Sequence, residues 1–242
     1  MKRILKKAIP AHQWAGLRNL YYPVKLMNKG KIFCISMQRN GTSSCGQFLK
    51  DYGFRTANYS VSARADWISR WMDGDLEGIF ESAAFRSYQA YEDSPWWFPD
   101  FYKYLYHRFP RAKFILFQRD PDTWFDSMLR HSNGNTLGNT YGHCKIYRRL
   151  SEFYEKLDHD PDFYPQGRAA DNLLSLEGRR MHYIQIYKEY NREVVEFFKK
   201  HDASRLFTGK LEDKKKWLKL GAFLDVQVEP GYNVHIKTPV RR

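Results

Sequence analysis

The sequence has few cysteines and no long apolar run, and each shortage excludes a class of protein. Only three cysteines occur among 242 residues, which cannot form a closed set of disulfides and are not spaced as zinc ligands. We therefore expect a reducing compartment and no metal. No apolar run approaches the ~20 residues that span a bilayer, and no signal-peptide core follows the basic start. These absences predict a cytoplasmic protein without a signal peptide or transmembrane helix.

Negative charge is also scarce. The chain has 27 Asp and Glu against 40 Lys and Arg, which gives a net charge of +13 with neutral histidines. Such an excess favours an anionic partner: a nucleotide, a nucleic acid, an acidic glycan or a membrane surface. The cations are scattered rather than gathered in one stripe, which argues against a nucleic-acid-binding module. Hydrophobic residues make up 43% of the chain, enough for a sizeable core.

The first 30 residues are a basic lead-in to a domain that we expect over residues 31–242. We interpret this lead-in as a solvated surface arm. Its Lys, Arg and Trp14 also permit an interfacial helix, and so a peripheral contact with an anionic membrane.

From residue 31 onward, short apolar runs alternate with helical patterns. The runs predict buried strands at 31–37, 113–118 and 205–208. Helices are predicted over 45–52, within 64–90, from Pro95 to Arg108, from Pro121 onward, and over 178–200 and 214–224. A loop rich in Gly, Asn, Ser and Thr is predicted from His131 to about Cys144. The alternation predicts a three-layer α/β/α fold with a mainly parallel central sheet.

A small polar turn follows the first strand. Its residues are Gln38, Arg39, Asn40, Gly41, Thr42, Ser43 and Ser44. Backbone N–H groups at the start of the next helix can bind an anion, Arg39 can pair with phosphate or sulfate, and two hydroxyls add donors. The glycine and lysine of an ATP-binding P-loop are missing, which disfavours an ordinary kinase or ATPase loop. Taken alone, the segment is equally well explained as a tight turn.

A second cation ends the second strand. Arg119 precedes Asp120 and Pro121, which are the expected cap and first residue of a helix, and Ser127 lies two turns further on. Ligands of parallel sheets bind at the carboxyl ends of strands. Arg119 and Ser127 could thus hold a second anionic group; the alternative is a surface arginine beside a capped helix.

Together the two units resemble the sulfotransferase family that uses 3′-phosphoadenosine 5′-phosphosulfate (PAPS). The first turn resembles the family's P-K/R-x-G-T-[ST] loop, and Arg119-Asp120-Pro121 with Ser127 matches its R-D-P-x5-S motif. Residues 218–224 and 228–238 resemble the family's C-terminal helix and closing stretch. The resemblance covers most of the chain from residue 31. It is closer to the glycan and small bacterial branch than to the cytosolic phenol and steroid branch.

The resemblance implies a P-loop NTPase-like sulfotransferase fold, PAPS as co-substrate, no metal, and transfer of a sulfuryl group to an acceptor hydroxyl or amine. It implies that the 5′-phosphosulfate is bound by Gln38, Arg39, Asn40, Gly41, Thr42, Ser43 and Ser44, and the 3′-phosphate by Arg119 and Ser127. Arg39 would stabilise charge on the bridging oxygen, and Asp93 is the expected base. The alternative for Asp93 is a cap for a helix beginning at Pro95.

The sequence departs from the family pattern in three places. Gln38 replaces the usual proline, and Arg39 stands where many members have lysine, so the charge is kept but a proton cannot be donated at neutral pH. Ser44 replaces the aromatic residue that stacks adenine in some members. Candidates for that stacking role are Phe48, Tyr52 and Trp124.

Two other functions stay open: a nucleotide-dependent kinase on a related fold, and a non-catalytic basic binding protein, which includes an inactive sulfotransferase fold. The acceptor is an unidentified glycan, lipid or small molecule, with a glycan or glycolipid suggested by the charge. His131 and His143 flank the predicted loop and could contact it. The aromatic residues between 91 and 106 either line an acceptor pocket or pack in the core.

Overall fold

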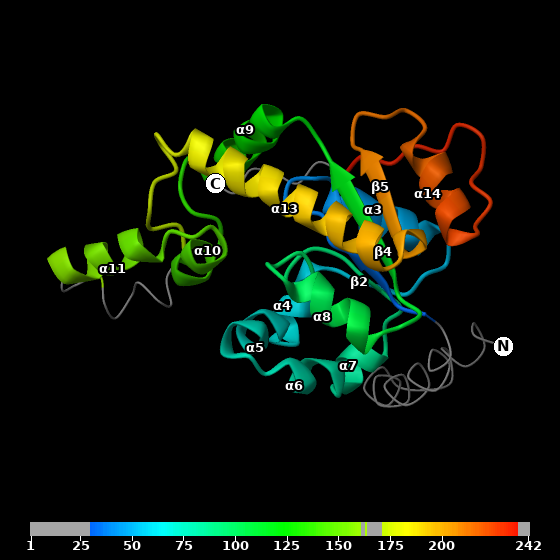
Figure 1. The fold of residues 1–242 in the computed structure, drawn as a ribbon, viewed down its shortest axis with the longest axis horizontal. Coiled ribbons are helices and arrows are strands. Elements are labelled where there is room, and N and C mark those ends of the chain that lie inside the picture. The colour runs from blue at the N-terminus through cyan, green and yellow to red at the C-terminus, as the bar shows by residue number, and fades with distance from the viewer. Residues whose placement is uncertain (1–29, 161–162, 164–170, 237–242) are drawn as a thin grey trace, which may run out of the picture.

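The computed structural model describes residues 30–160, 163 and 171–236 (Figure 1). The predicted basic lead-in and its membrane-binding helix therefore lie outside the described residues, apart from Gly30. None of the described helices is long and apolar enough to cross a membrane.

A five-stranded, all-parallel sheet runs through the centre of the fold in the order β2-β3-β1-β4-β5. The strands are β1 (Ile32–Cys34), β2 (Thr56–Ala57), β3 (Ala90–Tyr91), β4 (Lys113–Gln118) and β5 (Leu206–Lys210). After β3 the chain crosses to the other side of β1. This reversal leaves a crevice at the carboxyl ends of the central strands, where ligands of such sheets bind.

Alternate residues of the central strands build two separate cores. Phe33 and Phe114 pack in one apolar cluster, whereas Ile32, Cys34 and Ile115 pack in the other. The first cluster is completed by α8 (Phe101–Arg108), α9 (Pro121–Ser132) and α13 (Arg180–His201), and the second by α3 (Thr42–Asp51) and α14 (Lys216–Leu224). Helices on both faces of a parallel sheet confirm the predicted α/β fold.

The aromatic residues between 91 and 106 lie mostly in the first core. The Tyr91 ring stacks on Phe33 with centroids 5.0 Å apart, and Trp96 stacks on Phe101 at 5.8 Å. Their role is therefore to support the sheet from one side. Of this group, Trp97 and Phe98 also reach the cleft described below.

The pattern over residues 64–90 predicts helix, but the structure divides it. Short helices follow one another: α4 (Tyr59–Arg64), α5 (Trp67–Asp73), α6 (Leu76–Phe80) and α7 (Ala83–Arg86). Gly74 ends α5 with φ of 80°, and the side chains of Asp75 and Ser82 cap the two helices that follow. Caps every few residues override the apolar spacing.

Two further boundaries differ from prediction. The helix predicted from Pro95 begins only at Phe101, because residues 94–100 form turns. The predicted loop from 131 to 144 is shorter, since α9 continues to Ser132 and α10 (Thr140–Ile146) begins where Asn139 accepts a hydrogen bond from the Gly142 N–H. Helix α11 (Leu150–His159) and a short 3-10 turn, η1 (Ala203–Arg205), complete the described elements.

Candidate active site

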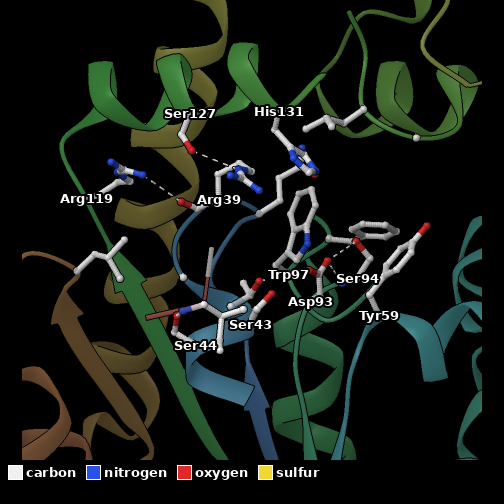
Figure 2. Close-up of a pocket in the computed structure, with 18 of the residues that line it drawn as sticks. Arg39, Ser43, Ser44, Tyr59, Asp93, Ser94, Trp97, Arg119, Ser127 and His131 are labelled. Carbon is white, nitrogen blue, oxygen red and sulfur yellow. Dashed lines mark hydrogen bonds between the residues drawn. The ribbon is translucent and has the colours of Figure 1, made fainter. Parts of the chain in front are cut away.

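The carboxyl ends of β1, β3 and β4 open into one cleft of about 1130 Å³ (Figure 2). Three segments meet there: residues 38–44 after β1, residues 93–94 after β3, and Arg119 after β4. Because these strands are neighbours in the sheet, the ends of all three lie at the same edge. The two motifs singled out in the sequence, and Asp93 with them, are thus brought together.

The turn after β1 has a strained backbone. It contains two residues in the left-handed conformation, and only one of them is a glycine, which adopts that conformation readily. Arg39 and Gly41 both have left-handed backbone angles, with φ of 68° and 72°. Glycine adopts this conformation at position 41 without strain, and an added Cβ there would displace the end of the flexible Leu211 side chain. Helix α3 then begins at Thr42, three residues before the predicted start at Cys45. The unpaired N–H groups of its first turn therefore belong to the motif itself.

Two residues of the turn hold its shape. Asn40 is buried, and its Oδ1 accepts a hydrogen bond from the Tyr187 hydroxyl at 2.9 Å. Gln38 donates from Nε2 to the Tyr147 hydroxyl at 2.9 Å, while its carbonyl accepts from Trp124 Nε1 at 2.9 Å. The Gln38 side chain borders the cleft, whereas Asn40 is not among the lining residues. Asn40 thus anchors the turn without lining the cleft.

The two predicted anion-binding groups are joined by hydrogen bonds (Figure 2). Arg39 donates from Nε to Oγ of Ser127 at 3.2 Å, and Arg119 donates from Nη1 to the carbonyl of Arg39 at 3.4 Å. Burial lowers the pKa of Arg39, as do the nearby charges of Arg119 and Arg130, while Asp93 opposes the effect. Three guanidinium groups this close favour a ligand with several negative charges.

Sequence reasoning missed two of the cations at the cleft. Arg130 lies on α9 three residues after Ser127, hence on the same helix face, and Lys216 is the first residue of α14. The i, i+3 spacing from Ser127 was a usable signal for Arg130. Lys216 had none, because its position depends on how α14 packs on the sheet. We call Arg39, Arg119, Arg130 and Lys216 the cationic half of the cleft.

The described end of the chain closes over the first turn of α3. Ser44 is buried, and its Oγ accepts a hydrogen bond from the backbone N–H of Ile236 at 2.9 Å. Ser43 remains half-buried and borders the cleft together with residues 234–236. The hydroxyl of Ser44 is therefore engaged in a hydrogen bond within the protein, whereas that of Ser43 faces the cleft (Figure 2).

Asp93 lies on the cleft floor in the segment after β3. Its Oδ1 accepts hydrogen bonds from the backbone N–H of Ser94 at 2.7 Å and from the Ser94 hydroxyl at 3.2 Å, and its Oδ2 accepts from the Thr42 hydroxyl at 3.2 Å. Burial raises the pKa of Asp93, against these hydrogen bonds and the charge of Arg39. The alternative that it caps a helix at Pro95 is wrong, because α8 begins at Phe101.

Glu92 lies behind Asp93 and away from the cleft. It is 4% exposed, and its Oε2 has no hydrogen-bond partner among the described residues. Burial, and then the charge of Asp93, raise the pKa of Glu92 well above its usual range. Glu92 therefore favours its protonated form, which keeps a second negative charge away from the floor of the cleft.

The other side of the cleft carries apolar and aromatic side chains. We call it the apolar half; its members are Tyr59, Ile68, Met72, Trp97, Phe98 and Leu137. His143 borders it as a neutral ring, because burial lowers the pKa of His143 to about 3. Its Nε2 lies 2.8 Å from the Tyr183 hydroxyl and its Nδ1 accepts from the Leu137 N–H at 3.0 Å, so it holds this wall together. His131, on α9, also borders the cleft.

None of the three aromatic residues proposed for adenine lines the cleft. Phe48 is buried and stacks on Trp217 with centroids 5.3 Å apart, and Tyr52 packs on Phe48 at 4.7 Å. Trp124 is buried and stacks on Tyr187 at 4.3 Å. These rings are used in the cores, and Trp217 is the aromatic residue that borders the cationic half.

Comparisons with known proteins assign the chain to a family. Among solved structures, a sulfotransferase from Alicyclobacillus acidocaldarius is similar to 86% of this chain over 87% of its own, with 13% identity and a TM-score of 0.44. No curated protein matches the chain significantly. The described residues contain no group of three or more His, Cys, Asp or Glu placed to hold a metal ion. A family model described as a sulfotransferase domain matches residues 31–233, and the chain therefore belongs to the sulfotransferase-domain family.

Proposed function

We propose that the protein transfers a sulfuryl group from PAPS to an acceptor hydroxyl and releases adenosine 3′,5′-bisphosphate. The observation that carries this proposal is the meeting of Arg39, Arg119 and Asp93 in one cleft, where hydrogen bonds join the turn after β1 to the end of β4. Two anion-binding groups side by side suit a nucleotide with negative charge at both its 3′ and 5′ positions.

The two ends of the nucleotide have separate partners in this proposal. The 5′-phosphosulfate is bound by Arg39, Gly41, Thr42 and Ser43, where the first turn of α3 offers backbone N–H groups and the helix dipole. The 3′-phosphate is bound by the residues of the second motif. These are Arg119 and Ser127, to which the structure adds the neighbouring Arg130. Gln38, Asn40 and Ser44 support the site by fixing the turn.

The reaction is an in-line displacement at sulfur. The acceptor oxygen forms a bond to sulfur while the bond from sulfur to the bridging oxygen of the 5′-phosphate breaks, and the hydroxyl proton passes to the Asp93 carboxylate. Arg39 stabilises the negative charge that develops on the leaving phosphate. It does so as a permanent cation, because its guanidinium holds its proton at neutral pH.

Thr42 links the base to the turn that binds the sulfuryl donor. Its hydroxyl donates to Oδ2 of Asp93 while its backbone N–H belongs to the first turn of α3. Ser94 fixes the other carboxylate oxygen. The carboxylate is therefore oriented from both sides, as a base must be if it is to meet a hydroxyl at the reacting sulfur.

Calorimetric titration with adenosine 3′,5′-bisphosphate tests the proposal, with adenosine 5′-monophosphate and ATP as matched ligands. We expect tight binding that depends on the 3′-phosphate and persists at moderate salt. Equal affinity for ATP would instead favour a kinase, and binding that simply fades with salt would favour a non-catalytic basic protein. Transfer of labelled sulfate from PAPS in the same samples separates an active enzyme from an inactive member of the fold.

A further inference from the structure

The charges along the cleft are divided between its two sides. Among the described residues that line it, the arginines and the lysine all belong to the cationic half. Three carboxylates among the described residues also line the cleft: Glu212, whose Oε1 lies 4.0 Å from Nε of Arg119 in the cationic half, Asp93 on the floor, and Asp171, which pairs with Asn139 beside the apolar half. The imidazole of His143 there is neutral, and that of His131 lies on α9 facing the same space. Among the described lining residues, the excess of positive charge therefore does not extend to the apolar half.

The side chains of the apolar half are positioned by two neighbouring helices and by aromatic packing behind them. Ile68 and Met72 lie one turn apart on α5 and face the cleft, and Tyr59, at the start of α4, is 42% exposed. Behind them, the Trp71 ring packs edge-on against Phe98 with centroids 4.8 Å apart.

Helix α10 supports this surface from the other side. Lys145 donates to the backbone carbonyl of Met72 at 3.0 Å, so this ammonium group is engaged behind the wall, and Lys145 does not line the cleft. Met72 also packs closely on α10, because a Cβ added at Gly142 would lie 2.8 Å from its Cε. These two contacts fix the position of Met72 in the wall.

We propose that the acceptor is an uncharged alcohol or phenol whose apolar body lies against Tyr59, Ile68 and Met72 while its hydroxyl reaches Asp93. An apolar body gains by leaving water at this surface. An anionic glycan would instead bring its charges toward Asp93 and Asp171, and no arginine or lysine lines this side among the residues that the structure describes. This inference rests on the proposed function and names the class of its acceptor.

The test compares acceptors at fixed PAPS. A series of 4-alkylphenols, from methyl to butyl, is run beside desulfated heparin, which keeps its carboxylates. We expect kcat/KM to rise by up to about fourfold for each added methylene until the wall is covered, and to exceed the value for heparin throughout. A flat alkyl series, or a higher kcat/KM with heparin, would overturn the inference.

Two matched methionine variants locate the effect. Met72→Gln places an amide on the wall, and we expect the KM for 4-butylphenol to rise about tenfold with little change in kcat. Met181→Gln is the control, because Met181 is 74% exposed on α13 and does not line the cleft. An equal KM in the two variants would count against the assigned wall.

Affinity for adenosine 3′,5′-bisphosphate is measured in every sample. If binding that depends on the 3′-phosphate is absent, the proposed function itself fails. If it is intact and heparin is preferred, only the acceptor class is wrong. The two failures are thus separated by one titration.

Discussion

The two halves of the cleft are assembled in different ways. Each main cation of the cationic half comes from a short segment directly after a strand: Arg39 after β1 and Arg119 after β4. The apolar half is contributed by the neighbouring helices α4 and α5, the turns that hold Trp97 and Phe98, and the connection before α10, so its members are spread from Tyr59 to Leu137. The proposed donor site is thus encoded by two local motifs, whereas the proposed acceptor site depends on long-range packing.

The halves also differ in the kind of contact that holds their side chains. Arg39 and Ser127 are hydrogen-bonded to each other, and Asn40 beneath them is buried. In the apolar half, Tyr59 is 42% exposed, whereas Phe98 is buried and packs against Trp71. Replacing a residue of the apolar half should therefore change acceptor preference, while replacing one of the cationic half should change nucleotide affinity. The variants below test whether the two halves act separately in this way.

The largest effect is expected on the floor between the halves. Asp93→Asn removes the proposed base without changing its shape, so kcat should fall by about 10²- to 10⁴-fold while affinity for adenosine 3′,5′-bisphosphate stays nearly constant. In the wild-type enzyme, activity should rise with pH through the raised pKa of Asp93, above the ordinary aspartate range. Steady-state rates across pH check both points. Unchanged turnover in the variant would remove Asp93 as the base.

The next largest effect concerns the cationic half alone. Arg119→Ala removes a guanidinium that is 21% exposed and borders the cleft. Losing a charge-assisted contact to the 3′-phosphate should weaken adenosine 3′,5′-bisphosphate by about 10- to 100-fold, with adenosine 5′-monophosphate little affected. Calorimetry measures both ligands. The matched control is Arg108→Ala, which removes an arginine that pairs with Glu77 and is 46% exposed; retained affinity in Arg119→Ala would reject the 3′-phosphate assignment.

The same contrast explains how much could be predicted from sequence. The strands around Phe33 and Phe114 were predictable because buried parallel strands are continuous apolar runs. The motif residues Arg39, Arg119 and Ser127 were predictable because they follow those strands at fixed spacing. Strands β2 and β3 were not, since each has only two residues and no pattern of its own.

The role of Asp93 could be foreseen only in part. Asp-Ser-Pro also reads as a helix cap, and only the pairing of β3 beside β1 places Asp93 at the same edge as the turn 38–44. The stacking candidates Phe48 and Trp124 failed for the opposite reason. An aromatic residue near a motif gives no sign of whether its ring faces the ligand or the core, and here both face a core.

A smaller effect is expected at Glu92, which separates the floor from the core. Its pKa is raised in the folded state, so its contribution to stability is complete below the ordinary glutamate pKa and is lost as pH rises above it. Glu92→Gln cannot ionise. Its free energy of unfolding relative to wild type should therefore increase with pH, by at most about 1.4 kcal/mol per pH unit.

Urea denaturation between pH 5 and 8 measures this difference. Glu77→Gln provides a control whose difference from wild type should stay nearly constant over this range, because hydrogen bonds from Tyr104 and Arg108 lower the pKa of Glu77. Glu77 stabilises the fold above its ordinary pKa and loses that contribution as pH falls. Parallel curves for the two variants would contradict the assignment of Glu92 as a buried, protonation-favouring carboxyl.

The smallest effect is expected for Arg130, one of the two cations that sequence reasoning missed. Arg130 borders the cleft one turn beyond Ser127, but its side chain is exposed, so water screens its attraction to the nucleotide. Arg130→Ala should weaken adenosine 3′,5′-bisphosphate by about three- to tenfold, less than Arg119→Ala, and the loss should shrink as salt increases. Calorimetry at two salt concentrations tests this, with the acceptor KM as a second readout. If the acceptor KM changes more than the nucleotide affinity, Arg130 acts on the acceptor. Its assignment to the cationic half, and with it the proposed division of charge along the cleft, would then be wrong.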